Sequence, residues 1–178
     1  MERQHLLENW LKAQFPGKIF TLQPASADAS FRRYFRIFLD SKTWIVMDAP
    51  PQQEDCKPFL QVANMLAATG VHVPKVWSYD LAQGFLLLSD LGHTTYLQIL
   101  TQEDDQANQL YSDATDALVK IQLSSQAPNL PDYDETLLRR ELNLFPDWYI
   151  AKHLQADLST TQKAMLENIF NQILQNNL

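Results

Sequence analysis

Two adjacent arginines at the start of a predicted strand are the residues of this chain best suited to bind an anion. The segment Ala27–Tyr34 (ADASFRRY) is a turn of small polar residues that leads directly into Arg32 and Arg33. Short side chains allow a backbone to approach a ligand closely, and each guanidinium offers a fork of donors to a group such as a phosphate. The alternative is an ordinary hairpin whose arginines face solvent, and this segment alone leaves both interpretations open.

The alternation of a β-strand places an arginine on each face of the predicted sheet. One face carries Phe31, Arg33 and Phe35, and the other carries Arg32, Tyr34 and Arg36. We therefore expect one arginine to lie beneath the sheet, where it needs an anionic partner. Asp48 could accept hydrogen bonds from Arg33 or Lys57, although an exposed aspartate in a turn is at least as plausible.

A second candidate site follows the apolar run Phe85–Leu88. Residues Ser89, Asp90 and Leu91 precede Gly92, at the point where β-like sequence gives way to helical sequence. One interpretation is a hinge whose backbone groups form hydrogen bonds with a purine edge. The other is a turn in which Asp90 caps the next helix.

The C-terminal half offers weaker candidates. The stretch Leu138–Tyr149 combines aromatic residues with charges, which suits a sugar-binding cleft, but core packing is the favoured explanation. Asp132 and Asp134 have the spacing of a metal-binding pair, yet their position before a helix favours an N-cap. The four histidines lie far apart in the sequence, with no spacing typical of metal ligands or a catalytic triad.

Hydrophobic periodicity predicts the elements that position these residues. A helix ends at Pro16-Gly17, and further helices are expected at Pro58–Thr69, Tyr96–Leu100, Asp105–Leu123, Asp134–Leu144 and Ser159–Asn176, the last with a capping box formed by Ser159 and Gln162. Strands are expected at Ile19–Leu22, Phe31–Leu39, Thr43–Met47, Val71–Tyr79 and Phe85–Ser89, with turns at Pro24–Ser30 and Asp40-Ser41. The change of texture near Gly92 predicts an α+β domain over residues 1–91 and a helical domain over residues 92–178.

Composition narrows the class of protein. The chain has 178 residues, of which 46% are hydrophobic, so it can form a real core. A net charge of −7 argues against a general nucleic-acid binder. With one cysteine no intrachain disulfide is possible, and no apolar run approaches the roughly 20 residues needed to span a bilayer. The expectation is a cytoplasmic protein without nucleic-acid or membrane partners.

Four segments, in order along nearly the whole chain, resemble one family. They are Asp28–Arg36 (DASFRRYFR), Val46–Pro51 (VMDAPP), Gly84–Gly92 (GFLLLSDLG) and Glu141–Tyr149 (ELNLFPDWY). They resemble the bacterial N-acetylmuramate/N-acetylglucosamine kinases of cell-wall recycling, which belong to the aminoglycoside phosphotransferase (choline kinase-like) superfamily. The resemblance implies a protein-kinase-like N-lobe, with a five-stranded antiparallel sheet and one packed helix, followed by the first helices of a truncated helical C-lobe.

The resemblance also implies ATP- and Mg²⁺-dependent phosphorylation of the anomeric hydroxyl of an amino sugar. By position, Ser30, Arg32 and Arg33 would grip phosphate, and Ser89, Asp90 and Leu91 would form the adenine hinge. Glu141 and Trp148 are weaker candidates for the sugar side. The predicted third strand lacks the lysine, and the following helix the glutamate, that pair in protein kinases. This departure agrees with the subgroup, in which Met-Asp-Ala-Pro occupies that strand.

The catalytic residues of phosphoryl transfer are missing from these 178 residues, because no histidine is followed two positions later by aspartate. We expect the family's catalytic segments and Mg²⁺ ligands beyond Leu178, and weak or no kinase activity for this chain. Two alternatives are a non-catalytic nucleotide-binding or interaction module and a kinase for another small alcohol, such as an aminoglycoside or choline. The broad apolar stripe of the last helix invites self-association.

Overall fold

The computed structural model describes residues 2–27, 30–102, 106–124 and 130–178. The chain divides into two compact units, Met1–Ala127 and Pro128–Leu178, and each is described by itself. The sheet and the helices that cover it belong to the first unit. The sequence-based boundary between residues 91 and 92 stays a prediction.

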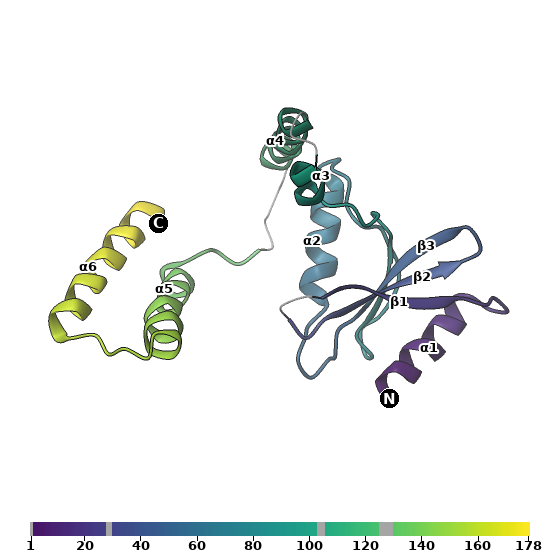
Figure 1. The fold of residues 1–178 in the computed structure, drawn as a ribbon, viewed down its shortest axis with the longest axis horizontal. Helices are drawn as coiled ribbons and strands as arrows, with labels where there is room; N and C mark the ends of the chain where they lie inside the picture. Colours follow the sequence, from purple (N-terminus) through teal and green to yellow (C-terminus); the bar gives the residue numbers. More distant parts are fainter. Residues whose placement is uncertain (1, 28–29, 103–105, 125–129) are drawn as a thin grey trace. The chain divides into compact units, whose positions relative to one another are not determined.

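The first unit is built on a five-stranded antiparallel sheet (Figure 1). Its strands are β1 (Thr21–Ala27), β2 (Arg33–Leu39), β3 (Lys42–Asp48), β4 (Val76–Asp80) and β5 (Phe85–Ser89), in the spatial order β1-β2-β3-β5-β4. The first three strands form the predicted meander, and a tight turn with Asp40 at φ 54° joins β2 to β3. This confirms the α+β class and the kinase-like sheet expected from the sequence.

The two edge strands differ most from the sequence-based prediction. The predicted turn Pro24–Ser30 is wrong at its start, because β1 continues through Pro24 to Ala27. Proline lacks an N–H donor but is tolerated at an edge, and the register of β1 shifts between Pro24 and Ser26. At the other edge, β4 is shorter than predicted: it begins at Val76, after Pro74, and its register shifts between Val76 and Ser78.

A helix covers each face of the sheet. Helix α1 (Glu2–Gln14) buries Leu7 and Leu11 against one face, in a cluster with Ile37, Val46, Phe85 and Leu87. Helix α2 (Lys57–Ala68) belongs to the other face, where Phe59 and Leu60 pack against a cluster of Met47, Ala49, Cys56, Leu86 and Leu88. Burial raises the pKa of the Cys56 thiol. The sequence predicted both helices, but the expectation of one packed helix left out the role of α1.

A close backbone approach joins β3 to the β4–β5 turn. Gly84 lies at φ +72°, and a Cβ at this position would stand 1.8 Å from the carbonyl oxygen of Ala49. The Ala49 N–H donates to the Gly84 carbonyl at 2.8 Å. Only glycine meets both requirements, so Gly84 fixes the turn against the end of β3.

The remaining secondary-structure elements of both units are helices. The first unit continues with α3 (Tyr96–Gln102) and α4 (Ala107–Ser124). The second contains α5 (Glu135–Leu144), a π-helix, η2 (Phe145–His153), and α6 (Thr160–Asn177). Asp134 caps α5, and Ser159 and Gln162 form a capping box on α6. Both caps were predicted from the sequence, whereas the π-helix was not predicted. Among the described residues, no helix is both long and apolar enough to cross a membrane.

Candidate functional site

A hollow of about 420 Å³ lies on the α2 face of the sheet. Its wall is largely apolar, and its rim is formed by the segment that follows β5. The wall residues come from four strands and from α2, and they include Ala25, Tyr34, Ile45, Phe59 and Leu88. An apolar wall beside exposed backbone suits a flat heteroaromatic ring with polar edges.

The rim contains all three residues predicted to form a hinge, Ser89, Asp90 and Leu91. Ser89 is held firmly in the sheet: its N–H donates to the Lys75 carbonyl at 2.8 Å, and its hydroxyl accepts from the Lys75 N–H at 2.8 Å. Asp90 accepts from the Gly92 N–H at 2.9 Å, so the alternative Asx turn is also present. The structure brings these residues to the hollow, and their role as an adenine hinge stays a prediction.

Arg36 joins the rim to β2. Its Nε and Nη2 donate to the two carboxylate oxygens of Asp90, at 2.6 and 3.1 Å, and Nη2 also donates to the Gly92 carbonyl at 2.7 Å. Both side chains are largely buried, with exposed fractions of 17% and 6%. Burial raises the pKa of Asp90, but the hydrogen bonds from Arg36 and Gly92 outweigh it and hold that pKa below its ordinary value. The hydrogen bonds that Arg36 donates to Asp90 raise the pKa of Arg36 in turn.

Arg32 lies on the same face of the sheet and pairs with Glu54. Its Nε donates to Glu54 Oε2 at 3.0 Å, and the N–H of Phe31 donates to Oε1 of the same carboxylate at 3.1 Å. Burial lowers the pKa of Arg32, but the hydrogen bonds with Glu54 and Tyr34 outweigh it and leave the pKa above its ordinary value. Ser30 lies beside this pair, and its hydroxyl accepts from the Arg32 N–H at 3.2 Å.

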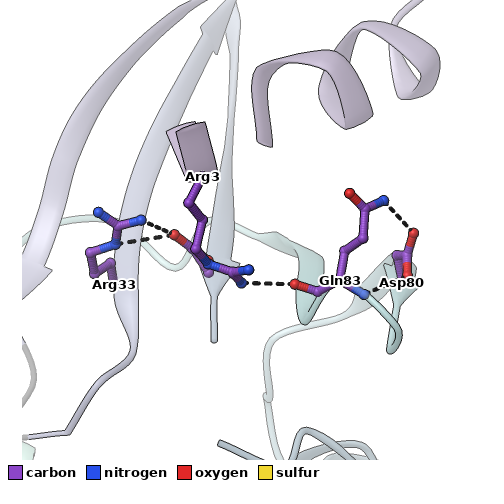
Figure 2. A network of polar contacts seen from close by, with 5 residues as sticks. Arg3, Arg33, Asp80 and Gln83 are labelled. Carbon is purple, nitrogen blue, oxygen red and sulfur yellow. Dashed lines mark hydrogen bonds and ion pairs between the residues drawn. The ribbon is translucent and has the colours of Figure 1, made fainter. Parts of the chain in front are cut away.

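Arg33 lies on the opposite face, covered by α1, and pairs with the fully buried Asp48. Asp48 also accepts from Arg3, in the first turn of α1, whose Nε lies 2.7 Å from Oδ1. Arg3 reaches further, to the Gln83 carbonyl at 2.7 Å, so the network ties α1, β2, β3 and the β4–β5 turn together (Figure 2). The prediction of an arginine on each face is confirmed. Of the interpretations left open for Asp48, the structure shows the hydrogen bond from Arg33, and the exposed turn aspartate is wrong.

Sequence reasoning missed Arg3, Arg36 and Glu54 as site residues. Arg3 and Glu54 lie 45 and 22 residues from their partners, and nothing in their local sequence distinguishes them from solvated charges. The indication for Arg36 in the sequence was stronger, because strand alternation places it on the same face as Tyr34. A buried arginine on that face needs a hydrogen-bond acceptor. Only the pairing of the strands shows that this acceptor is Asp90.

The two sugar-side candidates lie in the second unit. Glu141 accepts from its neighbour Arg140, at 2.9 Å. Trp148 is 65% exposed, so the core-packing interpretation is wrong for this residue. In the π-helix the rings of Phe145, Tyr149 and His153 stack instead, with successive centroids 5.5 Å apart. A role for Glu141 and Trp148 in binding sugar stays a prediction.

The described residues do not form a site for Mg²⁺. Within the described residues, no group of three or more His, Cys, Asp or Glu side chains is placed to hold a metal ion. Asp48, Glu54 and Asp90 are each paired with an arginine. We therefore assign Mg²⁺ to none of the described residues.

Comparison with known proteins identifies the family of this chain. A family model described as the phosphotransferase enzyme family (APH) matches residues 21–178. A protein of Pseudomonas aeruginosa named N-acetylmuramate/N-acetylglucosamine kinase is 56% identical over 137 residues, which are 77% of this chain and 40% of the relative. Proteins of the same name from Pseudomonas putida and Neisseria meningitidis are 47% and 39% identical, over 84% and 98% of this chain and 43% and 52% of their own length. The chain thus spans about half the length of the curated relatives it matches. It belongs to the phosphotransferase enzyme family.

Proposed function

We propose that this chain is the nucleotide-binding part of an ATP-dependent kinase that phosphorylates the anomeric hydroxyl of N-acetylmuramate or N-acetylglucosamine, in cell-wall recycling. The observation that carries the proposal is the hollow on the α2 face, whose apolar wall meets the segment Ser89–Leu91. The names of the relatives support the choice of acceptor.

In this proposal the adenine ring lies in the hollow against Ile45 and Leu88. The backbone after β5 forms hydrogen bonds with its polar edge, and Arg36 orients that backbone through Asp90. The triphosphate extends toward residues 30–33, where Ser30, Arg32 and Arg33 are candidate contacts.

We also propose that the 178 residues alone bind nucleotide without transferring phosphate. The sequence offers no His-x-Asp segment to orient an acceptor hydroxyl. Asp90, the carboxylate at the rim of the hollow, is engaged by Arg36 and so is poorly placed to serve as a base. The lack of a His-x-Asp segment in these 178 residues, together with the engaged Asp90, favours a non-catalytic nucleotide-binding module as the second candidate function.

Calorimetry and a kinase assay on the purified chain test these proposals. We expect binding of ATP and of adenosine, and no Mg-ATP-dependent phosphorylation of N-acetylmuramate. Absence of adenosine binding would contradict the assignment of the hollow, and phosphorylation would contradict the proposed inactivity. A longer protein that contains this chain, assayed with amino sugars, an aminoglycoside and choline, identifies the acceptor class.

A further inference from the structure

Protein kinases place a lysine on the third strand and pair it with a glutamate on the following helix. In this chain the lysine of β3 is Lys42, the exposed first residue of the strand, which alternation places with Val46 on the face covered by α1. On the α2 face, β3 presents Ile45 and then Met47. Ile45 lines the hollow, while Met47 is fully buried and pairs across the sheet with Tyr34. Helix α2 contains no carboxylate. The cation that would face the phosphates must therefore come from another element.

We propose that Arg32 supplies this cation and that Glu54 is the residue that positions it. This inference rests on the proposed function and identifies which arginine contacts the phosphates. Arg32 precedes β2 on the same face as Tyr34, which lines the hollow. Glu54 lies just before α2, so the Arg32–Glu54 ion pair connects the start of β2 to the segment that leads into α2.

Glu54 fixes both the side chain and the backbone of the arginine segment. One oxygen accepts from Arg32 Nε and the other from the Phe31 N–H. The carboxylate is 11% exposed, so its two bonds are sheltered from water. The contact uses one of the five N–H donors of the guanidinium. Such an arrangement holds the guanidinium in place before a ligand arrives, which reduces the entropy lost on binding.

Arg33 is the competing candidate, and charge alone would favour it, because Arg3 and Arg33 share the single carboxylate of Asp48. Strand alternation decides against it. Arg33 lies on the face covered by α1, whereas the hollow lies on the face of α2. Its Nε and Nη2 are both directed at Asp48. We therefore assign Arg33 to the structure of the sheet and Arg32 to the ligand.

The test compares the affinities of the chain for ATP, ADP and adenosine by calorimetry. We expect the chain to prefer ATP and ADP over adenosine. Arg32→Gln should weaken ATP and ADP binding by about tenfold, the loss typical of one charge-assisted hydrogen bond. Glu54→Gln should weaken them by a smaller factor, about threefold, because the amide still accepts but no longer carries charge. Adenosine affinity should stay unchanged in both variants.

Matched controls come from the opposite end of the β2–β3 hairpin, where Lys18 and Asp40 form an exposed pair at 3.2 Å. Lys18→Gln and Asp40→Asn change the net charge by the same amounts and should leave the preference for ATP over adenosine intact. Arg33→Gln should lower thermal stability and, below its unfolding temperature, should also keep that preference.

The outcomes separate this inference from the proposed function. Failure to bind adenosine overturns the assignment of the hollow, and the inference with it. Adenosine binding with no preference for ATP overturns the inference alone, as does loss of that preference in Arg33→Gln but not in Arg32→Gln. If Lys18→Gln weakened ATP binding as much as Arg32→Gln does, the effect of Arg32 would be one of net charge alone. That result would also overturn the inference.

Discussion

Arg36 and Asp90 form a two-point ion pair that fastens the segment after β5 to the middle of β2, with Nε to Oδ2 at 2.6 Å and Nη2 to Oδ1 at 3.1 Å. The two residues are 54 positions apart in the sequence. Both residues line the hollow, so the pair ties β2 to the rim of the proposed adenine site.

Arg36→Gln should lower the free energy of unfolding by about 2 to 3 kcal/mol, because it leaves a largely buried carboxylate without its charged partner. Urea unfolding followed by circular dichroism measures the change. Lys18→Gln, which breaks an exposed pair, is the control and should cost less than about 1 kcal/mol. Equal losses of unfolding free energy in Arg36→Gln and Lys18→Gln would show that burial of the Arg36–Asp90 pair adds nothing to stability.

The same pair predicts a dependence of stability on pH. The pKa of Asp90 is lower in the folded chain than in the unfolded chain, so its ionisation favours folding. This contribution is present above the unfolded value of about 3.9 and is lost as the pH falls through the lower folded value. The difference in urea midpoint between the wild-type chain and Asp90→Asn should therefore be largest near neutral pH and shrink in acid. A constant difference from pH 7 to pH 3 would contradict this.

Gly84→Ala should destabilise the first unit by about 2 to 4 kcal/mol, since the new methyl group combines a positive φ with a backbone clash. The Cβ would stand 1.8 Å from Ala49 O, and moving Ala49 away would disturb the hydrogen bond from its N–H to the Gly84 carbonyl. Gly70→Ala provides the control, because Gly70 has φ +79° and no heavy atom within 4 Å of an added Cβ. It should cost about 1 to 2 kcal/mol from the backbone conformation alone. Thermal and urea unfolding of both variants would measure the difference.

Arg3 and Arg33 should show strong non-additivity, because they share Asp48. Arg3→Gln and Arg33→Gln each leave one arginine on the buried carboxylate, and we expect losses of about 1 to 3 kcal/mol for each. The double variant leaves that charge unpaired, so its loss should exceed the sum. A double-mutant cycle by urea unfolding measures the coupling. Simple additivity would mean that the two arginines act independently.

The exposed side of α6 should promote self-association. Phe170 and Leu174 are buried, but Met165 and Ile169 on the same helix are 63% and 45% exposed. Sedimentation at increasing concentration should show dimers or larger species, and Ile169→Glu should weaken them. Lys163→Glu, a charge change on the same helix, is the control. A chain that stays monomeric at high concentration would contradict this prediction.

Local sequence patterns were sufficient for most of the fold. The apolar spacing of α1 and α2, the Asp40-Ser41 turn and the caps at Asp134 and Ser159 depend on neighbours within a few residues, and all were predicted correctly. The edge strands were not, because the tolerance of Pro24 in β1 depends on its having a partner on one side only. The π-helix also escaped prediction, since its sequence has no period that distinguishes it from an α-helix.

The candidate site was predictable only in part, for a physical reason. Residue type, strand alternation and the change to helical sequence made Arg32, Arg33 and Ser89–Leu91 candidates, because these signals are local. The partners that give each arginine its role come from distant elements: Glu54, Asp90 and Arg3. Which arginine faces the hollow follows from the strand register, and register is a property of the assembled sheet.

The register shifts in β1 and β4 have a consequence for how copies of this chain can meet. These two strands are the open edges of the sheet, and each departs from regular pairing geometry, near Pro24 in one and near Ser78 in the other. An irregular edge is a poor template for the backbone of a second molecule. The sheet therefore resists growth by strand addition, and contacts between copies are left to the side chains of the helices.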